Sequence, residues 1–480
     1  MSFVTKSLFA SAALLFSSSL PVFSQSLAEE VIEEYFAEAR QSGVTIDPGI
    51  KTVSGATVEW KDVIFGMPDG QGVMTWEFIR AEEIGDGRVS VSYPDEVAFK
   101  TTAKDEVPAI NATVDLAGVE HIISGTADAR RHDFTAPSIS YGVNSDDSSF
   151  DMNVEMSGVQ GMQMHSGDDI RHFSGDFSAD NLRVNYDMDD KDVKMSMKMD
   201  YQDFAIDFDA DSITEETAED LLNGKRNFKF NYSMGAGTSI TDMNQPDFVG
   251  VLTAASDGGQ GSISVSDGVF KMSGDARAAA YELKFTEMPL PPFQAEIDIA
   301  STSIEIPLKK TDTVVPAKIM FNLSGLKASD TLWGMVDPTG SLPRDKANLN
   351  IDLTANMKWL VDLVKADQAE GMPAEVQDVT INDITLQVAG AHLHGTGSAI
   401  VDNSKFPPEP VGTVDLDLKG GIGLLDKLVA LGLVPADQGE MVKMMSGMFT
   451  LPGGDGSDHL TSKIEMKEGG SILVNGNPVK

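Results

Sequence analysis

The stretch Val414-Asp-Leu-Asp-Leu-Lys419, with the leucine-rich run that follows it as far as Leu431, decides the predicted fold. Its apolar residues alternate with Asp and Lys, so one side of a strand faces a core and the other faces water. The leucines that follow recur at helical spacing until Gly432 and Pro435, which respectively favour a helix end and forbid its continuation. The sequence therefore predicts a half-buried antiparallel sheet that carries a short helix.

A second helix is predicted directly after the first. Asp437 and Glu440 have the spacing of a capping box. A methionine stripe at positions i, i+3, i+4 and i+7 follows, made up of Met441, Met444, Met445 and Met448. Flexible thioether side chains suit a binding surface that adapts to its partner, but at helical spacing such a stripe is more typical of core. We therefore expect a lid packed on the last strands.

Most of the remaining chain predicts strands and turns. Leu27 to Ala39 forms an amphipathic helix with an acidic polar face, and alternating segments from Val44 to about Phe99 predict a β meander. Asp330 to Val336 predicts a short helix and Met357 to Val364 a longer amphipathic one. The predicted fold class is mainly β with a few short helices (α+β): an elongated, curved antiparallel sheet built from meanders, with helices at the N-terminus and in the C-terminal third.

A repeat of about 50 residues is a further hypothesis for the region between Gly125 and Leu308. It is marked by glycines that are each followed by a tyrosine, namely Gly125, Gly175, Gly224 and Gly274. Because the chain has 44 glycines, chance coincidence is the competing interpretation. The predicted organisation is a signal peptide at 1–24, an N-terminal helix plus β meander at 25–125, a repetitive β region at 126–325, and a helix-containing β module at 326–480.

The first residues have the pattern of a secretory signal peptide. Lys6 precedes an apolar run from Leu8 to Phe16, and Val22 and Ser24 occupy the −3 and −1 positions of a cleavage site. The run is shorter than the roughly 20 residues that a membrane-spanning helix needs, which disfavours an uncleaved anchor. We expect export to the periplasm and a mature chain without a transmembrane helix.

The composition narrows the classes of function. Lys plus Arg is 36 against 74 for Asp plus Glu, which gives a formal net charge of −38 at pH 7. This excess of negative charge repels nucleic acid and anionic membrane surfaces, so no nucleic-acid partner is expected. The chain has no Cys, which excludes disulfides and thiolate catalysis.

Several C-terminal segments resemble the DUF2125 family. They are Asp337-Pro-Thr-Gly-Ser-Leu-Pro-Arg-Asp345, Met357-Lys-Trp-Leu-Val-Asp-Leu363, the run from Gly423 to Pro435, and Leu473-Val-Asn-Gly-Asn477. Members of this family are exported alphaproteobacterial proteins whose function is not established. The resemblance covers about Asp337 to Lys480 and implies a periplasmic, β-rich protein. It brings no catalytic residues to this sequence.

Two groups of residues have side chains that suit metals. His392 and His394 lie two apart in a strand pattern, so both rings would project from one face and could form half of a Zn or Cu site. Met162, Met164 and His165 could attract Cu(I) through their thioethers, although alternating Met is more typical of core. Two ligands do not make a site, and a surface pair and a core segment are the favoured interpretations.

Two other groups of residues are weaker indications of a functional site. A run of aspartates suggests Ca²⁺ but lacks the Gly and the terminal Glu of an EF-hand loop, so a solvated turn is favoured. The run consists of Asp187, Asp189, Asp190 and Asp192. Ser324 and Lys327 have the spacing of a Ser nucleophile and a Lys base, but the companion motifs of penicillin-binding enzymes are missing. No catalytic, cofactor-binding or metal-binding residue is therefore predicted.

The functional expectation is a non-enzymatic periplasmic envelope protein that binds a lipid or another amphiphile on its curved sheet. The alternative is a structural or interaction protein that scaffolds other envelope proteins through sheet edges or acidic faces. An enzyme would require a cluster of His and carboxylates that meets only in three dimensions.

Overall fold

The computed structural model describes residues 26–479, apart from residues 42, 68–69, 71, 104–107, 148, 168–170, 191–192, 213–217, 247, 289, 364–371, 455 and 457. The predicted signal peptide lies outside the described residues. Strands make up 65% of the structure and helices 11%. This confirms the predicted mainly β class, with antiparallel meanders and with helices near the N-terminus and in the C-terminal region.

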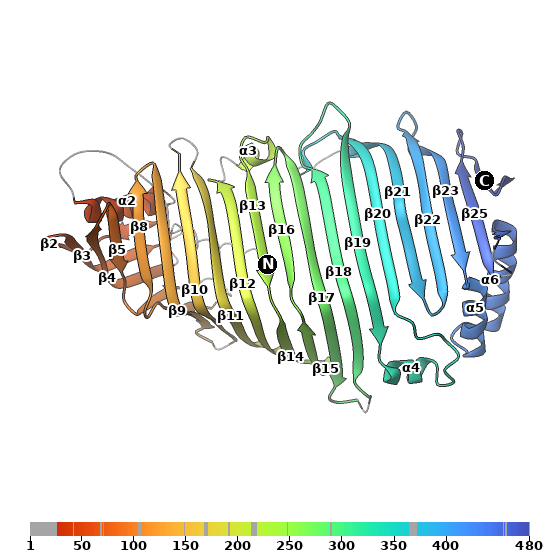
Figure 1. Ribbon diagram of the computed structural model, residues 1–480, viewed down its shortest axis with the longest axis horizontal. Coiled ribbons are helices and arrows are strands. Elements are labelled where there is room, and N and C mark those ends of the chain that lie inside the picture. The colour runs from red at the N-terminus through yellow and green to blue at the C-terminus, as the bar shows by residue number, and fades with distance from the viewer. Residues whose placement is uncertain are drawn as a thin grey trace. The chain divides into compact units, whose positions relative to one another are not determined.

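The chain divides into two units, which are described separately (Figure 1). Unit 1 holds the residues up to Ser212 together with Tyr232–Leu252, and unit 2 holds Ile213–Asn231 together with the chain from Thr253 onward. The chain passes between the units within β13 (Phe228–Met234) and β15 (Phe248–Ser256).

Unit 1 combines one helix with an antiparallel sheet. Its elements are α2 (Leu27–Gln41), β1 (Thr45–Asp47), β2 (Ile50–Ser54), β3 (Thr57–Gly66), β4 (Gly72–Gly85), β5 (Arg88–Ser92), β6 (Glu96–Thr101), β7 (Ile110–Asp115), β8 (Glu120–Thr126), β9 (Ala129–Ser145), β10 (Phe150–Ser166), β11 (His172–Asp190), β12 (Val193–Asp211) and β14 (Gly237–Gln245). Long strands pair with two shorter ones end to end, so β4 pairs with both β5 and β6, and β9 with both β7 and β8.

The amphipathic helix α2 lies on one face of the N-terminal strands and forms the main core of unit 1. Phe36 of α2 packs edge-on against Trp60 of β3, with the ring centroids 5.8 Å apart. Both side chains are almost completely buried, as are Val58, Ile79 and Val89 around them. The predicted amphipathic helix therefore packs on its own sheet, because its apolar face meets the inward side chains of the strands.

Unit 2 is an antiparallel meander with short helices at its ends and connections. Its elements are α3 (Ala218–Leu222), β16 (Gly259–Ser266), β17 (Val269–Phe285), β18 (Phe293–Pro307), β19 (Val315–Ala328), α4 (Asp330–Val336), β20 (Ala347–Trp359), β21 (Ala374–Val388), β22 (Ala391–Asp402), β23 (Glu409–Lys419), α5 (Gly421–Ala430), α6 (Ala436–Phe449), β24 (Leu451–Pro452), β25 (His459–Met466), β26 (Ile472–Val474) and β27 (Asn477–Pro478). From β16 to β23 each strand pairs with the next, and β23 then pairs with β25.

Two helix predictions were wrong in detail. The segment expected to form a helix from Met357 instead ends strand β20, where Met357 pairs with Val315 and Val376. The alternation that runs along β20 extends through Met357, so sheet pairing overrides the helical spacing of the residues beyond it. Helix α6 begins at Ala436 with Pro435 at its N-cap and no side-chain cap, so the predicted capping box does not form.

The glycines of the predicted repeat occupy different structural positions. Gly125 lies at the end of β8, Gly175 lies within β11, Gly224 follows α3 in a turn, and Gly274 lies within β17. Their spacing therefore does not correspond to a repeated arrangement of strands.

At one level of the long strands, the backbone of several neighbouring strands departs from regular β geometry. Beyond that level the other set of alternate residues faces inward. In β9 the inward residues are even-numbered up to Ala136 and odd-numbered from Ile139, yet both residues belong to one apolar cluster. Gly158 of β10 lies at the same level with a φ of +64°, and Asp203 of β12 has a φ of +49°. The side chain of Asp180 on β11 lies over Gly158, where a Cβ atom would come within 2.1 Å of Asp180 Oδ2.

The same arrangement of a strand glycine under an aspartate side chain occurs in unit 2. A Cβ on Gly325 of β19 would come within 2.0 Å of Asp298 Oδ2 on β18. An extra residue at one level of each strand keeps the apolar side continuous while the sequence alternation shifts by one. Strict alternation therefore cannot be followed along the full length of these strands.

We predict that Gly158→Ala destabilises unit 1 more than Gly55→Ala does. Both glycines have a φ near +63°, but a Cβ on Gly55 would meet nothing within 4 Å. The shared backbone strain costs about 1 kcal/mol, and the contact with Asp180 adds about 1–3 kcal/mol. Urea denaturation followed by circular dichroism measures both losses, and Asp180→Ala should relieve part of the loss at Gly158. Equal losses for the two alanine variants would contradict this account.

Candidate functional site

One face of the unit 2 sheet is lined by aligned apolar residues. Register partners from β19 to β25 form a row of leucines, namely Leu323, Leu349, Leu386, Leu393, Leu418 and Leu460. A second row on the same face, from β16 to β26, consists of Ile263, Met272, Ile304, Ile319, Leu353, Ile381, Gly397, Val414, Ile464 and Val474. We call these rows and the inward residues between them the apolar face of unit 2.

The opposite face of the same strands is polar. Asn322 donates to Asn350 Oδ1 at 3.4 Å, and Asn350 donates to Asp383 Oδ2 at 2.5 Å. Lys271 and Glu305 form an ion pair at 3.4 Å on neighbouring strands. This ladder of amides and charges satisfies its own hydrogen bonds and faces water.

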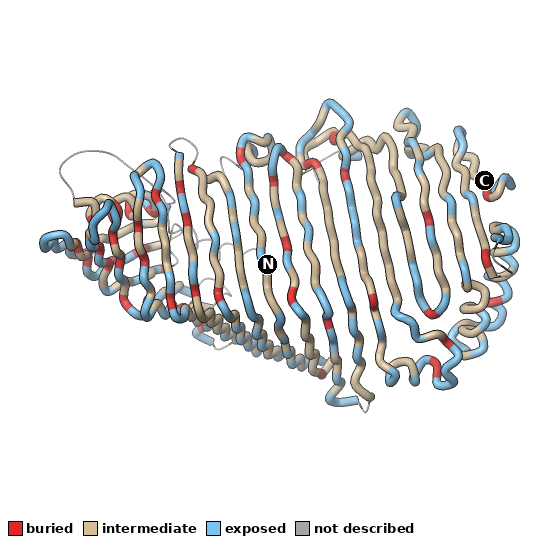
Figure 2. Tube along the Cα trace, in the orientation of Figure 1, coloured by how far each residue is buried: buried red, intermediate tan, exposed pale blue. Residues whose placement is uncertain are grey.

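The apolar face of unit 2 is only partly buried. Ile319, Phe321 and Leu386 keep 44%, 38% and 37% of their surface exposed. Among the described residues, the clusters of fully buried apolar side chains both lie in unit 1. Figure 2 shows the same contrast, with buried residues frequent on the strands near α2 and intermediate or exposed residues along most strands of unit 2. An apolar sheet face of this kind is typical of a surface that contacts another molecule.

The helices of unit 2 meet this sheet near its ends. Helix α5 contacts β22 and helix α4 contacts β18. Ser462, which shares the inward side of β25 with Leu460, donates to the carbonyl oxygen of Phe449 at 2.8 Å. The C-terminal end of α6 is therefore joined to β25, whereas the helix itself packs on α5 and not on the last strands as the predicted lid.

The methionine stripe is not the buried part of α6. Met441, Met444, Met445 and Met448 are 55%, 65%, 47% and 64% exposed. The prediction that the stripe is core was wrong, because α6 uses its opposite side to pack on α5. Periodicity located the stripe correctly but could not tell which side of the helix is buried.

Unit 1 carries a comparable apolar surface beyond the part that α2 covers. One register row across β9 to β12 consists of Tyr141, Val154, Val184 and Met199, and the next consists of Val143, Met152, Tyr186 and Met197. Apart from Val143, these side chains are half-buried rather than enclosed.

Three histidines form a hydrogen-bonded row on the inward side of unit 1, of which His121 and His165 are buried and His132 is half-buried. Tyr93 Oη lies 2.7 Å from His121 Nδ1, and His121 Nε2 lies 3.0 Å from His132 Nδ1. His132 Nε2 lies 3.2 Å from His165 Nε2, and Arg171 Nη1 lies 3.3 Å from His165 Nδ1. Strands β8, β9 and β10 supply one histidine each, so the row crosses the sheet.

The donor and acceptor roles along this row follow from Arg171, which can only donate. His165 accepts at Nδ1 and therefore carries its proton on Nε2, which donates to His132. His132 then donates from Nδ1 to His121, and His121 donates from Nδ1 to Tyr93. Every histidine is neutral in this arrangement, and each ring both donates and accepts one hydrogen bond.

Burial is the main reason why these rings stay neutral. It lowers the pKa of His121 to about 3, and the neighbouring His132 lowers it further while Asp133 opposes the shift. Burial followed by the charge of Arg130 lowers the pKa of His132 to about 4. Burial, His132 and Arg171 lower the pKa of His165 to about 3.

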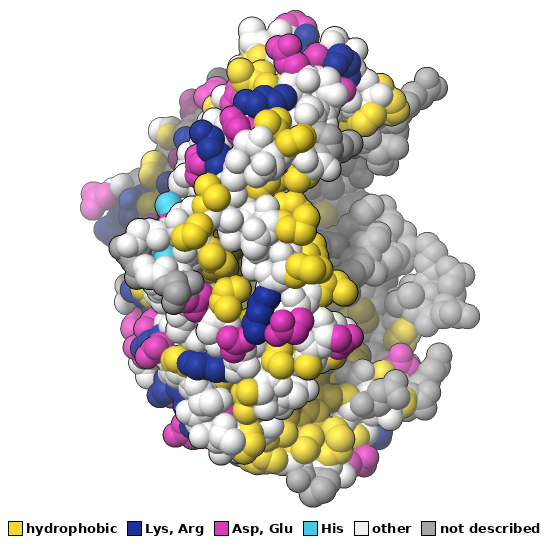
Figure 3. Space-filling model, turned by 90° about the vertical axis from the view of Figure 1, so that its right-hand side faces the viewer, with side chains coloured by type: hydrophobic (Ala, Val, Ile, Leu, Met, Phe, Trp, Pro, Cys, Tyr) yellow, Lys and Arg dark blue, Asp and Glu magenta, His cyan; other side chains and the backbone are white. Residues whose placement is uncertain are grey.

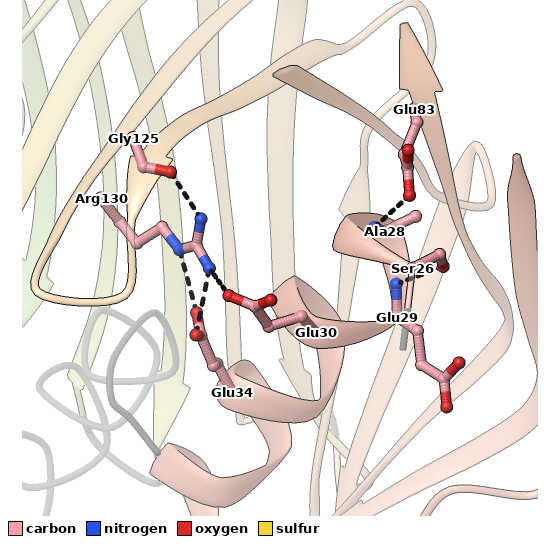
Figure 4. Close-up of polar contacts among 8 residues, drawn as sticks. All are labelled: Ser26, Ala28, Glu29, Glu30, Glu34, Glu83, Gly125 and Arg130. Carbon is pink, nitrogen blue, oxygen red and sulfur yellow. Dashed lines mark hydrogen bonds and ion pairs between the residues drawn. The ribbon is translucent and has the colours of Figure 1, made fainter. Parts of the chain in front are cut away.

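Arg130 lies opposite His165 in the sheet and joins the strands to α2. It is 2% exposed, and its guanidinium donates to Glu30 at 2.7 Å, to Glu34 at 2.9 and 3.0 Å, and to the carbonyl oxygen of Gly125 at 2.7 Å (Figure 4). A buried guanidinium with this many acceptors is stable, whereas the loss of a partner would leave an uncompensated charge.

The candidate metal ligands do not converge. His392 and His394 lie on the polar face of β22, where His394 Nε2 is 3.3 Å from Asp383 Oδ1. Met164 is 38% exposed on one side of β10, while His165 is buried on the other, so they cannot share an ion. Met164 is also too exposed to be core. In the part of the chain that the structure describes, no group of three or more His, Asp or Glu side chains could hold a metal ion.

The other two candidate sets are also separated or partly undescribed. Ser324 hydroxyl donates to Asn348 Oδ1 at 3.3 Å, whereas Lys327 pairs with Glu296 at 3.4 Å. Asp189 pairs with Lys194 at 2.6 Å in the β11–β12 hairpin, and Asp192 lies outside the described residues. The Ser and Lys side chains therefore have different partners and do not form a nucleophile–base pair.

The sequence pattern alone does not indicate the histidine row, because the row depends on the register of three strands. The available signal was that His121 alternates with the inward Ile123, which places a histidine on the apolar side of a strand. A histidine in such a position must find a hydrogen-bond partner inside the protein.

The family comparison bears on unit 2. Residues 246–474 match the model of DUF2125, described as an uncharacterized protein conserved in bacteria. This part of the chain is therefore similar to the DUF2125 family. Among the described residues, no helix is both long and apolar enough to span a membrane.

No curated protein matches the chain. Solved structures with some similarity include the alcaligin outer membrane receptor FauA from Bordetella pertussis, at 9% identity over 90% of this chain and 69% of the receptor, with a TM-score of 0.16. The ferric preacinetobactin receptor BauA from Acinetobacter baumannii shows 8% identity over 91% of this chain and 77% of the receptor, with a TM-score of 0.14. TM-scores this low do not indicate a shared fold.

The DUF2125 motif around Asp337 is a loop folded on a buried carboxylate. Asp337 is 0% exposed and accepts hydrogen bonds from the Leu342 amide at 2.7 Å, the Thr339 hydroxyl at 2.9 Å and the Ser341 hydroxyl at 3.1 Å. Burial raises the pKa of Asp337, but these hydrogen bonds lower it by more, so the carboxylate stays ionised. The motif therefore stabilises the connection between α4 and β20.

We predict that the histidine row makes unit 1 sensitive to mild acid. The unfolded chain binds protons at a pKa of about 6.5, whereas the folded rings resist protonation until about pH 3–4. The unfolded state therefore binds more protons between these values, so the free energy of unfolding falls as the pH drops below 6.5. The loss by pH 5 is roughly 2 kcal/mol per histidine.

Urea denaturation at pH 7.5 and pH 5 measures this loss. His132→Gln should reduce the difference between the two pH values, whereas His394→Gln, a control whose side chain is 46% exposed, should leave it unchanged. The same pH dependence in all three proteins would rule out the row as its cause.

Proposed function

We propose that the apolar face of unit 2 binds the hydrocarbon part of a lipid or another amphiphile. The observation that carries this proposal is the alignment of leucine and isoleucine rows on a face whose side chains keep up to 44% of their surface exposed at Ile319. Sheets bury an apolar face against another layer, and hydrocarbon chains can supply that layer.

The chemistry of the rows favours a ligand selected by its apolar part. The two rows carry no charged side chain, so they offer dispersion contacts and removal of water rather than hydrogen bonds. The polar group of an amphiphile would remain at the rim in contact with water. We expect broad tolerance of head groups, because no ion pair or hydrogen-bond donor of the rows would recognise them.

We further propose that the protein acts in the periplasm and has a binding rather than a catalytic role. The signal-peptide pattern of residues 1–24 supports export. The binding role is supported by the separation of the Ser324 and Lys327 side chains and by the apolar character of the candidate face.

The location has a direct test. The protein recovered from a periplasmic fraction should begin at Gln25, since cleavage is expected after Ser24. N-terminal sequencing checks this result. A full-length chain that remains in the cytoplasmic fraction would overturn the proposed location.

The proposed binding face predicts different effects for two neighbouring residues of β19. Ile319 and Met320 are 44% and 45% exposed, but only Ile319 belongs to the apolar face. Ile319→Gln should weaken binding of the uncharged fluorescent probe N-phenyl-1-naphthylamine about tenfold, because roughly 1.4 kcal/mol of apolar contact is lost. Met320→Gln, on the polar face, should leave the affinity unchanged.

Native mass spectrometry of protein purified without detergent supplies the second measurement. A co-purified amphiphile that is lost in Ile319→Gln supports the proposal. The absence of any bound amphiphile, together with equal probe binding in both variants, would overturn it.

A second candidate function is binding to other envelope proteins, and the exposed methionine stripe of α6 favours it.

A further inference from the structure

Helix α6 is held on α5 by the side opposite its methionines. Gly439 is buried, and a Cβ atom there would come within 2.5 Å of Val429 Cγ2 on α5. The close approach fixes this side of α6 against its neighbour. The methionine stripe, defined as Met441, Met444, Met445 and Met448, therefore points away from α5 and is 47–65% exposed.

Exposed apolar residues also lie just before and just after the helix in the sequence. Leu433 precedes α6 and is 48% exposed, and Leu451 follows it and is 52% exposed. Figure 3 looks onto the side of the molecule where Figure 1 labels α5 and α6, and it shows hydrophobic side chains in patches separated by small groups of charged ones.

The charges beside the stripe are mostly negative. Asp437 lies one turn before Met441, and Glu440 lies one turn before Met444, so both flank the stripe. The lysine of α6, Lys443, pairs with Asp426 of α5 at 2.6 Å and with Glu440 at 3.2 Å. Its charge is thereby committed to neighbouring carboxylates.

We propose that the methionine stripe of α6 docks a basic amphipathic helix of another protein. Unbranched thioether side chains adjust to varied apolar partners, which suits them to helix-in-groove recognition. Asp437 and Glu440 would pair with Lys or Arg beside the apolar side of the partner. The net charge of −38 steers a basic partner toward the chain.

The charges disfavour the other two occupants. Helices that lie in a bilayer interface carry Lys and Arg on their polar face, whereas α6 carries Asp437 and Glu440. A second copy in parallel would bring these carboxylates together. A second copy in antiparallel orientation would place them beside the negative C-terminal end of the partner helix. This inference is independent of the amphiphile proposal, because it concerns α6 and not the sheet rows.

The test uses the full mature chain and a labelled 18-residue helical peptide with a leucine side and a lysine polar side. Its counterpart has the same leucine side and a glutamate polar side. Fluorescence anisotropy at 150 mM NaCl should show micromolar binding of the lysine peptide and at least tenfold weaker binding of the glutamate peptide. The double variant Met444→Gln and Met448→Gln should lose at least tenfold in affinity for the lysine peptide, because two apolar contacts are removed.

Two controls separate this site from the sheet. Ile319→Gln should leave peptide binding unchanged, so failure of the amphiphile proposal and failure of this one remain distinguishable. Methionine oxidation followed by mass spectrometry should show that the lysine peptide protects the stripe but not Met320, which is 45% exposed on the polar face of β19.

Three results would overturn the proposal. Equal binding of the two peptides would show that charge does not select the partner. Unchanged binding by the double variant would show that the methionine stripe is not the binding surface. A dimer, or binding to phosphatidylcholine vesicles, that the double variant abolishes would identify a second copy or a bilayer as the occupant instead.

Discussion

The structure depends on one constraint: a sheet with one apolar face must cover that face with something other than water. Unit 1 meets the constraint in part through α2, whose Phe36 closes over Trp60 and whose Glu30 and Glu34 hold the buried Arg130. In unit 2, α4 and α5 reach the sheet at β18 and β22, and Ile319 in the row of β19 remains 44% exposed. In both units, helices thus pack on a sheet, but the apolar sheet face of unit 2 keeps more of its surface exposed.

Charged and titratable residues also lie between α2 and the sheet of unit 1. Arg130 joins Glu30 and Glu34 of α2 to the strands, and its charge lowers the pKa of the neighbouring His132. The guanidinium, the carboxylates and the imidazoles therefore form one coupled group rather than separate contacts. Acid would act on this group through the histidines, because their protonation would place further positive charge beside Arg130.

The sequence was informative where one local pattern decides the outcome. The alternation from Val414 to Lys419 predicted an apolar and a polar side, and both are found on β23. It was less informative where a distant contact decides. Met357 joins a strand because Val315 and Val376 pair with it, and His121, His132 and His165 meet because three strands share a register. Neither outcome follows from spacing along the chain.

The exposed apolar faces and the acidic composition are complementary. A chain with uncovered hydrophobic rows would associate with itself unless another force kept the copies apart. The net charge of −38 gives repulsion between copies, with Asp and Glu spaced along polar strand faces such as those of β12 and β23. The negative charge therefore opposes association of two copies through this face. If a hydrocarbon ligand covers that face, it stabilises unit 2 by an amount that rises with the logarithm of the free ligand concentration once the face is occupied.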